Sequence, residues 1–581
     1  MAGLGNLTHW MRRFGDQYAA RTIRSPRQVP DFVNRPDPLS IGTLKKAQHI
    51  VAGHLVLAGQ SVETKGADIW SITPPSSAFD TELHGFGWLD DLAALGDKQA
   101  RSLAQSWVFS WLNRYDQGRG TGWRADLAGR RVIRLLHHHA LICQNRSVAE
   151  VEQYYINLSN HMQFLSKRWQ AVPRGVPRLE ALTGLILGGL TLTGHDDFVP
   201  PATGALVREC RQYVDADGGI ATRQPSELLD IAVLLMWSAQ ALSAAGWTPA
   251  PSHLQAIDAI IASLRTLRHA DGSLPRFHGG SRGVLGRLDF VLSQSQPGSL
   301  PKSNGVVMGY AKLSAGRTSV VMDAAPPPTG VASLQAHAST LGIELVSGRR
   351  PVIVNCGSGH DFGTKWRSAS RATAAHSSAT IQGLSSAKLG QTLRQGARVG
   401  QLLVNGPSKV PTEFNQDGQV ARAQAAHDGY VRHCGVTHIR DIALTSDGRT
   451  LTGEDLFMAI SDRDKTVCAG AGLAQGLDVA INFHVHPDVA ITVLPARSKV
   501  QMTLRNGETW IFAHDGTLQL GLDTSAYLET GYAEPRATKQ IILSGKIINY
   551  ATRIRWSFSK SHDTALAVRD VTDVDRHHPK S

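Results

Sequence analysis

The spacing of hydrophobic residues changes near residue 300, and this change divides the chain into two parts. Between about residues 80 and 270, apolar positions recur every three or four residues, as at Leu228, Ile231 and Leu235, which is the period of an amphipathic helix. Short turns such as Ala245-Gly246 and Asp271-Gly272 separate these segments, which favours antiparallel helical hairpins. The pattern predicts helices over 98–115, 130–143, 148–169, 179–192, 202–214, 225–245 and 252–269.

Beyond residue 300 the chain consists of short segments with alternating or β-branched residues. Turn dipeptides such as Asp447-Gly448 and Asn506-Gly507 separate them, as expected for β-hairpins. Many short strands at this spacing favour an antiparallel β-sandwich over a parallel sheet. The pattern predicts strands over 319–323, 342–346, 351–355, 379–382, 441–444, 479–486, 501–504, 509–513 and 539–543.

The predicted fold is therefore multidomain α+β, with a helical domain over residues 41–295 and an antiparallel β-sandwich over 296–565. Residues 1–40 are predicted to be a basic tail or a peripheral helix, and 566–581 a C-terminal tail. Residues 45–80 are ambiguous and are assigned a small hairpin.

Composition narrows the class of protein. The chain has 581 residues, 42% of them hydrophobic, which excludes global disorder and a collagen-like structure. Its five cysteines include no C-x-x-C pair, so a disulfide scaffold or a zinc ribbon is not expected. The net charge of +12 suits an anionic partner or a uniformly basic surface, but no dense basic block or nucleic-acid-binding motif is present. We expect no nucleic-acid partner.

The sequence predicts no transmembrane segment and no signal peptide. The longest apolar run, 179–192, is interrupted by Thr183 and by three glycines, whereas a span needs about 20 mostly apolar residues. A cytoplasmic location follows as an expectation. The basic segment from Arg12 to Arg27 is either a solvated tail or an amphipathic helix peripheral to the inner membrane.

Several motifs in both halves combine histidine, arginine and aromatic residues. The helical half carries Gly122-Trp-Arg-Ala-Asp126, Arg130-Arg131 and Pro177-Arg-Leu-Glu180. The β half carries Gln335-Ala-His337, Val352-Ile-Val-Asn-Cys-Gly357, Trp366-Arg367, Arg371-Ala-Thr-Ala-Ala-His376, His427-Asp-Gly-Tyr430 and His484-Val-His486-Pro487. In this order the motifs resemble the heparinase II/III family, especially its alphaproteobacterial members, over about residues 80–560. The resemblance implies an incomplete (α/α) toroid followed by an antiparallel β-sandwich.

The resemblance also implies a polysaccharide lyase that cleaves a uronic-acid glycosidic bond by β-elimination. Such chemistry requires a group that neutralises the uronate carboxylate, a base for the C5 proton and an acid for the leaving oxygen. Arginine suits the first task because its guanidinium binds both carboxylate oxygens. We therefore expect an acidic glycan or oligosaccharide as the partner, held between toroid and sandwich.

The resemblance implies a structural zinc ion at His337, Asn355 and His376, with Asn355 where the family usually has Asp. Gln335 stands where a catalytic His is common, and the position of a catalytic Tyr offers Phe362 or Trp366. The toroid's Asn–His pair for the uronate is replaced by Arg178 and Glu180.

The remaining candidates are assigned as follows. The catalytic candidates are Glu180, His427 and Tyr430; the substrate-binding candidates are Trp123, Arg130, Arg178, Gln335, Trp366, Arg367 and Arg371. Structural alternatives are a salt bridge for Arg130, Arg178 and Glu180, core packing for the tryptophans and an ordered turn for His427 and Tyr430.

Three functions remain open at this stage. The first is a lyase acting on a uronic-acid-containing glycan. The second is a glycoside hydrolase on the same scaffold, with a carboxylate pair drawn from Asp126, Glu180, Glu227 and Asp230. The third is a non-catalytic, envelope-related glycan-binding protein. Assembly is left open, with a homodimer as one candidate.

Overall fold

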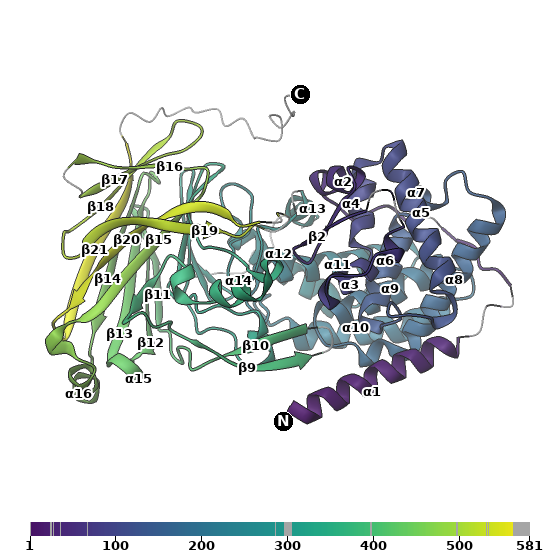
Figure 1. The fold of residues 1–581 in the computed structure, drawn as a ribbon, viewed down its shortest axis with the longest axis horizontal. Coiled ribbons are helices and arrows are strands. Elements are labelled where there is room, and N and C mark those ends of the chain that lie inside the picture. Colours follow the sequence, from purple (N-terminus) through teal and green to yellow (C-terminus); the bar gives the residue numbers. More distant parts are fainter. Residues whose placement is uncertain are drawn as a thin grey trace.

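The computed structural model describes residues 2–561, except positions 24, 25, 27, 35, 65, 67, 285, 295–304, 396–397, 496–497, 530–531 and 533. A helical half and a β half lie side by side along the longest axis of the molecule (Figure 1). This is the predicted α/α toroid followed by an antiparallel β-sandwich. The predicted boundary at 295/296 and the predicted tail at 566–581 lie outside the described residues.

The helical half follows the predicted periodicity closely. Local signals fix its helix ends: the side chain of Ser147 and that of Glu150 form a capping box at the start of α8. The predicted segment 130–143 is instead two helices, because His138 leaves the helical conformation and its imidazole binds Asp90 at 2.8 Å. The helices are α2 (Leu44–Val51), α3 (Ser77–His84), α4 (Gly87–Leu95), α5 (Lys98–Arg114), α6 (Ala125–His137), α7 (His139–Cys143), α8 (Val148–Arg168), α9 (Val176–Thr191), α10 (Val199–Tyr213), α11 (Pro225–Ala244), α12 (Pro251–Leu267) and α13 (Arg287–Ser293). The hairpin assigned to 45–80 is also present, as β1 (His54–Leu57) paired with β2 (Gln60–Glu63).

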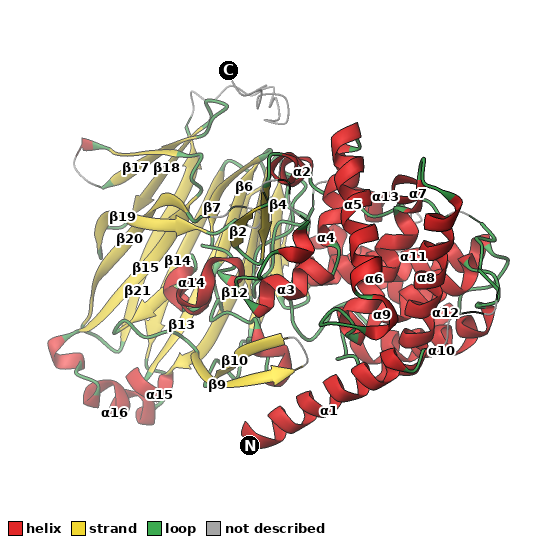
Figure 2. Cartoon of the chain, turned by 45° about the vertical axis from the view of Figure 1, so that its right-hand side comes forward, coloured by secondary structure: helices red, strands yellow, loops and turns green. Residues whose placement is uncertain are grey.

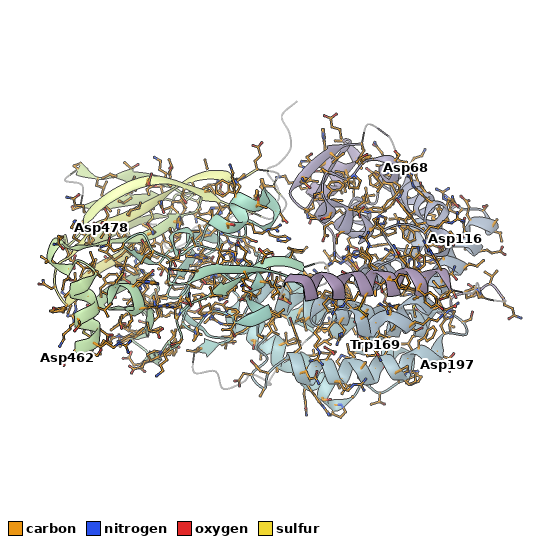
Figure 3. All side chains as sticks on the ribbon, turned by 60° about the horizontal axis from the view of Figure 1, so that its bottom comes forward. Asp68, Asp116, Trp169, Asp197, Asp462 and Asp478 are labelled. Atoms are coloured by element: carbon orange, nitrogen blue, oxygen red, sulfur yellow. The ribbon has the colours of Figure 1, made fainter. Side chains whose placement is uncertain are left out.

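The N-terminal segment forms a helix, α1 (Ala2–Arg21), on the surface of the helical half (Figure 3). Its inner face is held by Asp16, whose carboxylate accepts a hydrogen bond of 2.7 Å from Arg168, and by the buried Ala19 and Ala20. Of the two alternatives for residues 1–40, the peripheral helix is the one that forms.

Helix α11 is the one described helix that is long and apolar enough to cross a membrane, judged by length and composition. Of its most apolar window, 72% is buried inside the protein. It packs between α9 and α12, so we interpret it as a core helix of the toroid.

The β half stacks two antiparallel sheets around one core (Figure 2). The eight-stranded sheet has the order β11 (Thr412–Gln416), β12 (Val420–Tyr430), β13 (Val436–Thr445), β14 (Thr450–Met458), β21 (Ala551–Lys560), β18 (Thr509–His514), β17 (Lys499–Thr503), β16 (Ala490–Val493). The other sheet has the order β19 (Gln519–Tyr527), β20 (Arg536–Ile547), β15 (Leu477–Val485), β7 (Arg350–Val354), β6 (Ile343–Ser347), β5 (Thr318–Asp323), β4 (Tyr310–Ala315), β3 (Val306–Val307), with β8 (Ala379–Ile381) paired to β15.

Smaller elements complete the β half. The hairpin of β9 (Lys388–Gln395) and β10 (Arg398–Val404) reaches toward α1, which it contacts. The short helices are α14 (Gly363–Ala369), α15 (Val431–Cys434) and α16 (Asp462–Gly470).

One arginine of the helical half fastens it to the sandwich. Arg223, just before α11, donates hydrogen bonds to the carbonyls of Met308 (3.0 Å) and Gly309 (2.8 Å) and pairs with the buried Asp323. Its guanidinium also lies 4.8 Å from the ring centroid of Tyr310. These contacts fix the orientation of the two halves, and thereby position the residues that face the junction.

Buried histidines make stability depend on pH. Burial lowers the pKa of His84 and His137 to about 3 and that of His161 well below its usual value. An unfolded His titrates near 6.5, so below that pH the unfolded chain binds more protons at these positions than the folded protein does. The contribution of these neutral histidines to the free energy of unfolding is therefore fully present well above pH 6.5. It decreases as the pH falls from 6.5 toward 3. Asp91, whose pKa burial raises to about 6, has the opposite sign, as do Asp16, Asp80 and Asp230, whose pKa values burial also raises; their contributions come at lower pH, because an unfolded Asp titrates near 3.9.

We expect the free energy of unfolding to fall by at least about 1 kcal/mol per pH unit between pH 6.5 and 5. Urea denaturation at pH 7.5, 6.5, 5.5 and 5.0 measures this slope. A flat profile over that range would contradict the assignment of these histidines as neutral and buried.

Candidate functional site

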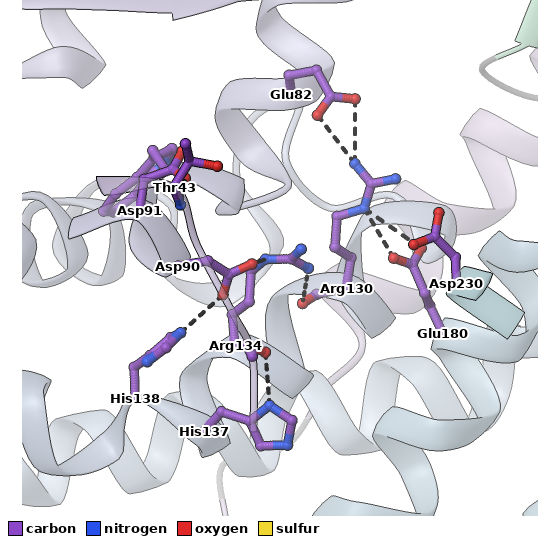
Figure 4. Close-up of polar contacts among 12 residues, drawn as sticks. Thr43, Glu82, Asp90, Asp91, Arg130, Arg134, His137, His138, Glu180 and Asp230 are labelled. Carbon is purple, nitrogen blue, oxygen red and sulfur yellow. Dashed lines mark hydrogen bonds and ion pairs between the residues drawn. The ribbon is translucent and has the colours of Figure 1, made fainter. Parts of the chain in front are cut away.

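Close packing of α6 and α9 brings Arg130 and Glu180 together. A Cβ on Gly129 would lie 2.5 Å from the Cα of Ala181, so glycine is what allows the two helices to approach. The neighbouring side chains then meet, and Arg130 Nε donates to Glu180 Oε1 at 3.2 Å. Figure 4 shows Arg130 between Glu180 on one side and Glu82 of α3 on the other, 3.2 Å from its Nη1.

Two further charges extend this group, which we call the Arg130 cluster: Glu82, Arg130, Glu180, Asp230 and Arg287. Arg287 Nη1 lies 2.9 Å from Asp230 Oδ1, and Asp230 lies beside Glu180 (Figure 4). Burial raises the pKa of Asp230, an effect that Arg287 opposes and Glu180 increases. Its side chain nevertheless keeps 43% of its surface exposed, as does that of Glu82. The cluster is thus enclosed by protein but reached by solvent.

The charge of a residue in the β half reaches one member of the cluster, Glu82. Burial raises the pKa of Glu82, but the charges of Arg130, Arg134 and the more distant His360 outweigh it and the net shift is downward. His360 precedes α14 in the β half. The two carboxylates around Arg130 raise the pKa of its guanidinium, with Glu180 the larger cause. The positive charge of Arg130 is therefore already balanced by two carboxylates of the protein itself.

The other toroid candidates lie elsewhere. Arg178 does not pair with Glu180; it binds Glu209 at 3.0 Å and the carbonyl of Val172 at 2.9 Å. Trp123 is buried, stacked on His161 with 4.7 Å between ring centroids. The prediction that Trp123 offers a face to a sugar is wrong, because both the ring and its Nε1, which donates to the carbonyl of Tyr115, are used inside the core.

The hydrolase candidates also separate. Asp126 pairs with Arg124 (2.6 Å), while Glu227 accepts a hydrogen bond of 3.0 Å from Tyr213. Glu180 and Asp230 remain together in the Arg130 cluster.

Of the substrate-binding candidates in the sandwich, Trp366 on α14 is exposed, at 37%. Arg367 follows it and donates to the carbonyl of His360 at 3.0 Å. Gln335 is half-buried beside Gly279, next to the toroid. Arg371 is buried and donates to the carbonyls of Ser333, Ala336 and Gln401 at 2.7–2.8 Å. Its assignment to substrate is therefore corrected to a structural role, because its donors are consumed by backbone.

The catalytic candidates His427 and Tyr430 lie in the sandwich core. Each has 1% of its surface exposed. The hydroxyl of Tyr430 donates to the carbonyl of Ala379 at 2.6 Å, and burial raises its pKa further above its usual value, away from that of a useful acid or base. His427 contacts His438 at 3.3 Å, and burial holds its pKa well below the usual value. The assignment of these two residues to acid/base catalysis is corrected, because a sugar has no access to either.

The predicted metal residues come together in part. His337 Nδ1 lies 3.1 Å from His376 Nε2. Asn355 accepts a hydrogen bond from the backbone N–H of Ser377 (3.0 Å) and donates one to Glu344 (3.2 Å). Within the described residues, no group of three or more His, Cys, Asp or Glu is placed to hold a metal ion.

Sequence reasoning missed Glu82 and Arg287. Neither belongs to a motif, and each meets the cluster through a helix far away in sequence. The one local signal is Gly129, which precedes Arg130 inside a helix where glycine is otherwise unfavourable.

Comparisons with known proteins agree with this fold. Residues 297–557 match the family model described as heparinase II/III-like, C-terminal. The chain is 28% identical over 526 residues to FtsZ-localized protein C of Caulobacter vibrioides, covering 88% of each chain.

Solved structures resemble it as well. Heparinase III superposes with a TM-score of 0.65 at 11% identity, over 95% of this chain and 90% of that one. A mutant of the heparan sulfate lyase HepC from Pedobacter heparinus superposes with a TM-score of 0.56 at 13% identity, over 95% and 87% of the chains. At this identity the likeness concerns the fold.

Proposed function

We propose that this chain, whose residues 297–557 match the heparinase II/III-like, C-terminal family model, binds a glycan at the toroid–sandwich junction without cleaving it. The observation that carries the proposal is that the candidate groups for β-elimination are occupied or inaccessible. Elimination needs a cation free to neutralise a uronate and a base at its C5 proton. Arg130 is held between Glu82 and Glu180, while His427 and Tyr430 are buried in the sandwich.

Exposed groups near the junction support a binding role. Trp366 offers an accessible indole, whose face suits the apolar C–H face of a sugar ring. The half-exposed carboxylates of Glu82 and Asp230 are acceptors for sugar hydroxyls. The relative called FtsZ-localized protein C matches 88% of this chain, which supports localisation with FtsZ as the setting of this function.

The test is an assay of uronate-containing and neutral oligosaccharides for binding and for products. We expect saturable binding, no ultraviolet absorbance from an unsaturated uronate, and unchanged oligosaccharide mass. Trp366→Ala should weaken binding at least about tenfold, a loss of about 1.4 kcal/mol, because the indole face that covers the C–H face of the sugar is removed. Trp247→Ala, which removes a tryptophan of similar exposure (43%), is the matched control and should bind normally.

Two outcomes would overturn the proposal. Unsaturated products would establish a lyase. Products that have gained one water would establish a hydrolase, for which Glu180 and Asp230 are the carboxylates that lie together in the structure.

We further propose that α1 holds the protein at an anionic membrane surface. Met11, Phe14 and Tyr18 share one face of the helix and are 59%, 59% and 66% exposed. Arg12, Arg13 and Arg21 are exposed beside them. Exposed apolar side chains and arginines on one helix are the composition of helices that lie in the plane of an anionic bilayer, and the net charge of +12 adds long-range attraction.

A further inference from the structure

Residues that take the place of a family metal site do not offer the donors that zinc requires. Structural zinc is held by about four thiolate, imidazole or carboxylate ligands. His337 and His376 provide two imidazoles, but the third position is Asn355, a neutral amide.

The hydrogen-bond partners of His376 fix its tautomer. Its Nδ1 lies 2.9 Å from the carbonyl oxygen of Ala372, which can only accept, so Nδ1 carries the proton. In the neutral ring Nε2 then has a lone pair, and it lies 3.1 Å from His337 Nδ1. His337 must donate this bond. The two rings meet at 72°, edge to face, and both lie in the interior, 3% and 1% exposed.

The side chain of Asn355 is hydrogen-bonded to the carboxylate of Glu344. Its amide oxygen is occupied by the backbone N–H of Ser377, so its Nδ2 is the atom that points to Glu344 Oε1 at 3.2 Å. An aspartate in this position would place a second carboxylate against Glu344, with repulsion that a bound cation would relieve. The amide makes a hydrogen bond there without any cation.

We propose that a direct hydrogen bond between His337 and His376, supported by the Asn355–Glu344 pair, replaces the metal centre in this chain. The bond joins the segment before β6 to the segment before β8. It also reaches the toroid, because the backbone N–H of His337 donates to His278 Nδ1 at 3.2 Å. This inference is independent of glycan binding.

Metal analysis of the purified full-length protein tests the proposal directly. We expect less than about 0.1 equivalent of zinc, and a melting temperature that neither a chelator nor added zinc changes by more than about 1 °C. Stoichiometric zinc, or a chelator-induced fall of several degrees, would overturn it.

A gain-of-function variant gives an independent readout. Asn355→Asp restores the carboxylate, so added zinc should raise the melting temperature of N355D by at least about 2 °C. The matched control N355D/H376A lacks one imidazole and should respond less than half as strongly. If N355D does not fold because of Glu344, N355D/E344Q removes that repulsion and is tested in the same way. A wild-type response equal to that of N355D would contradict the proposal.

Discussion

Replacement of Asp455 by asparagine should lower the free energy of unfolding by about 3–5 kcal/mol. Asp455 of β14 lies directly across from Arg440 of β13, and both side chains are fully buried. Its carboxylate accepts hydrogen bonds from Arg440 Nε (2.8 Å), His438 Nε2 (2.6 Å) and Trp556 Nε1 (2.7 Å). Asparagine has nearly the same shape but no charge, so Arg440 would become a buried cation without a counterion. Urea denaturation followed by tryptophan fluorescence measures the loss.

The same strand offers a matched control. Asp441 follows Arg440, but its side chain points to the outer face of the sheet, where it pairs with the largely exposed Arg422. Asp441→Asn should cost less than about 1 kcal/mol, because a surface ion pair contributes little. Equal effects of the two substitutions would show that desolvation of Arg440 is not the cause.

Replacement of Met11, Phe14 and Tyr18 by serine should weaken binding to anionic vesicles at least about tenfold, a loss of about 1.4 kcal/mol or more. The three side chains are largely exposed in the folded protein, so we expect the substitution to change the free energy of unfolding little. Co-sedimentation with vesicles that contain phosphatidylglycerol measures the affinity. The interaction should weaken as salt increases, because arginines contribute.

Exposed hydrophobic residues elsewhere on the helical half supply the control. Val148, Trp247 and Leu254 are 76%, 43% and 43% exposed, and their triple serine variant should bind vesicles as the unmodified protein does. Equal binding by the α1 variant would exclude α1 as the membrane contact. If the unmodified protein bound vesicles of neutral lipid alone as tightly as anionic vesicles, a contribution from charge would be excluded.

The site was harder to predict than the fold, for reasons that particular residues illustrate. Strand β12 escaped the pattern because its inward positions include Ala421, Ala423 and Ala425, which give a weak hydrophobic signal. The sequence offers both Glu180 and Arg130 as candidates, but no local pattern pairs two residues that lie 50 positions apart. In the sequence, His427 and Tyr430 resemble an acid/base pair. In the structure, both side chains are buried in the core of the sandwich.

Sequence alone determined the two halves, most of the helix and strand positions and the family resemblance. These follow from local periods of 3.6 and 2 residues and from motifs read along the chain, which need no tertiary information. The tertiary structure decided which charges meet. Arg130 and Glu180 are 50 positions apart, and their contact depends on how closely α6 packs against α9. The same packing pairs Arg130, a predicted substrate-binding residue, with carboxylates of the protein. A buried charge is stable only where the fold supplies its partner.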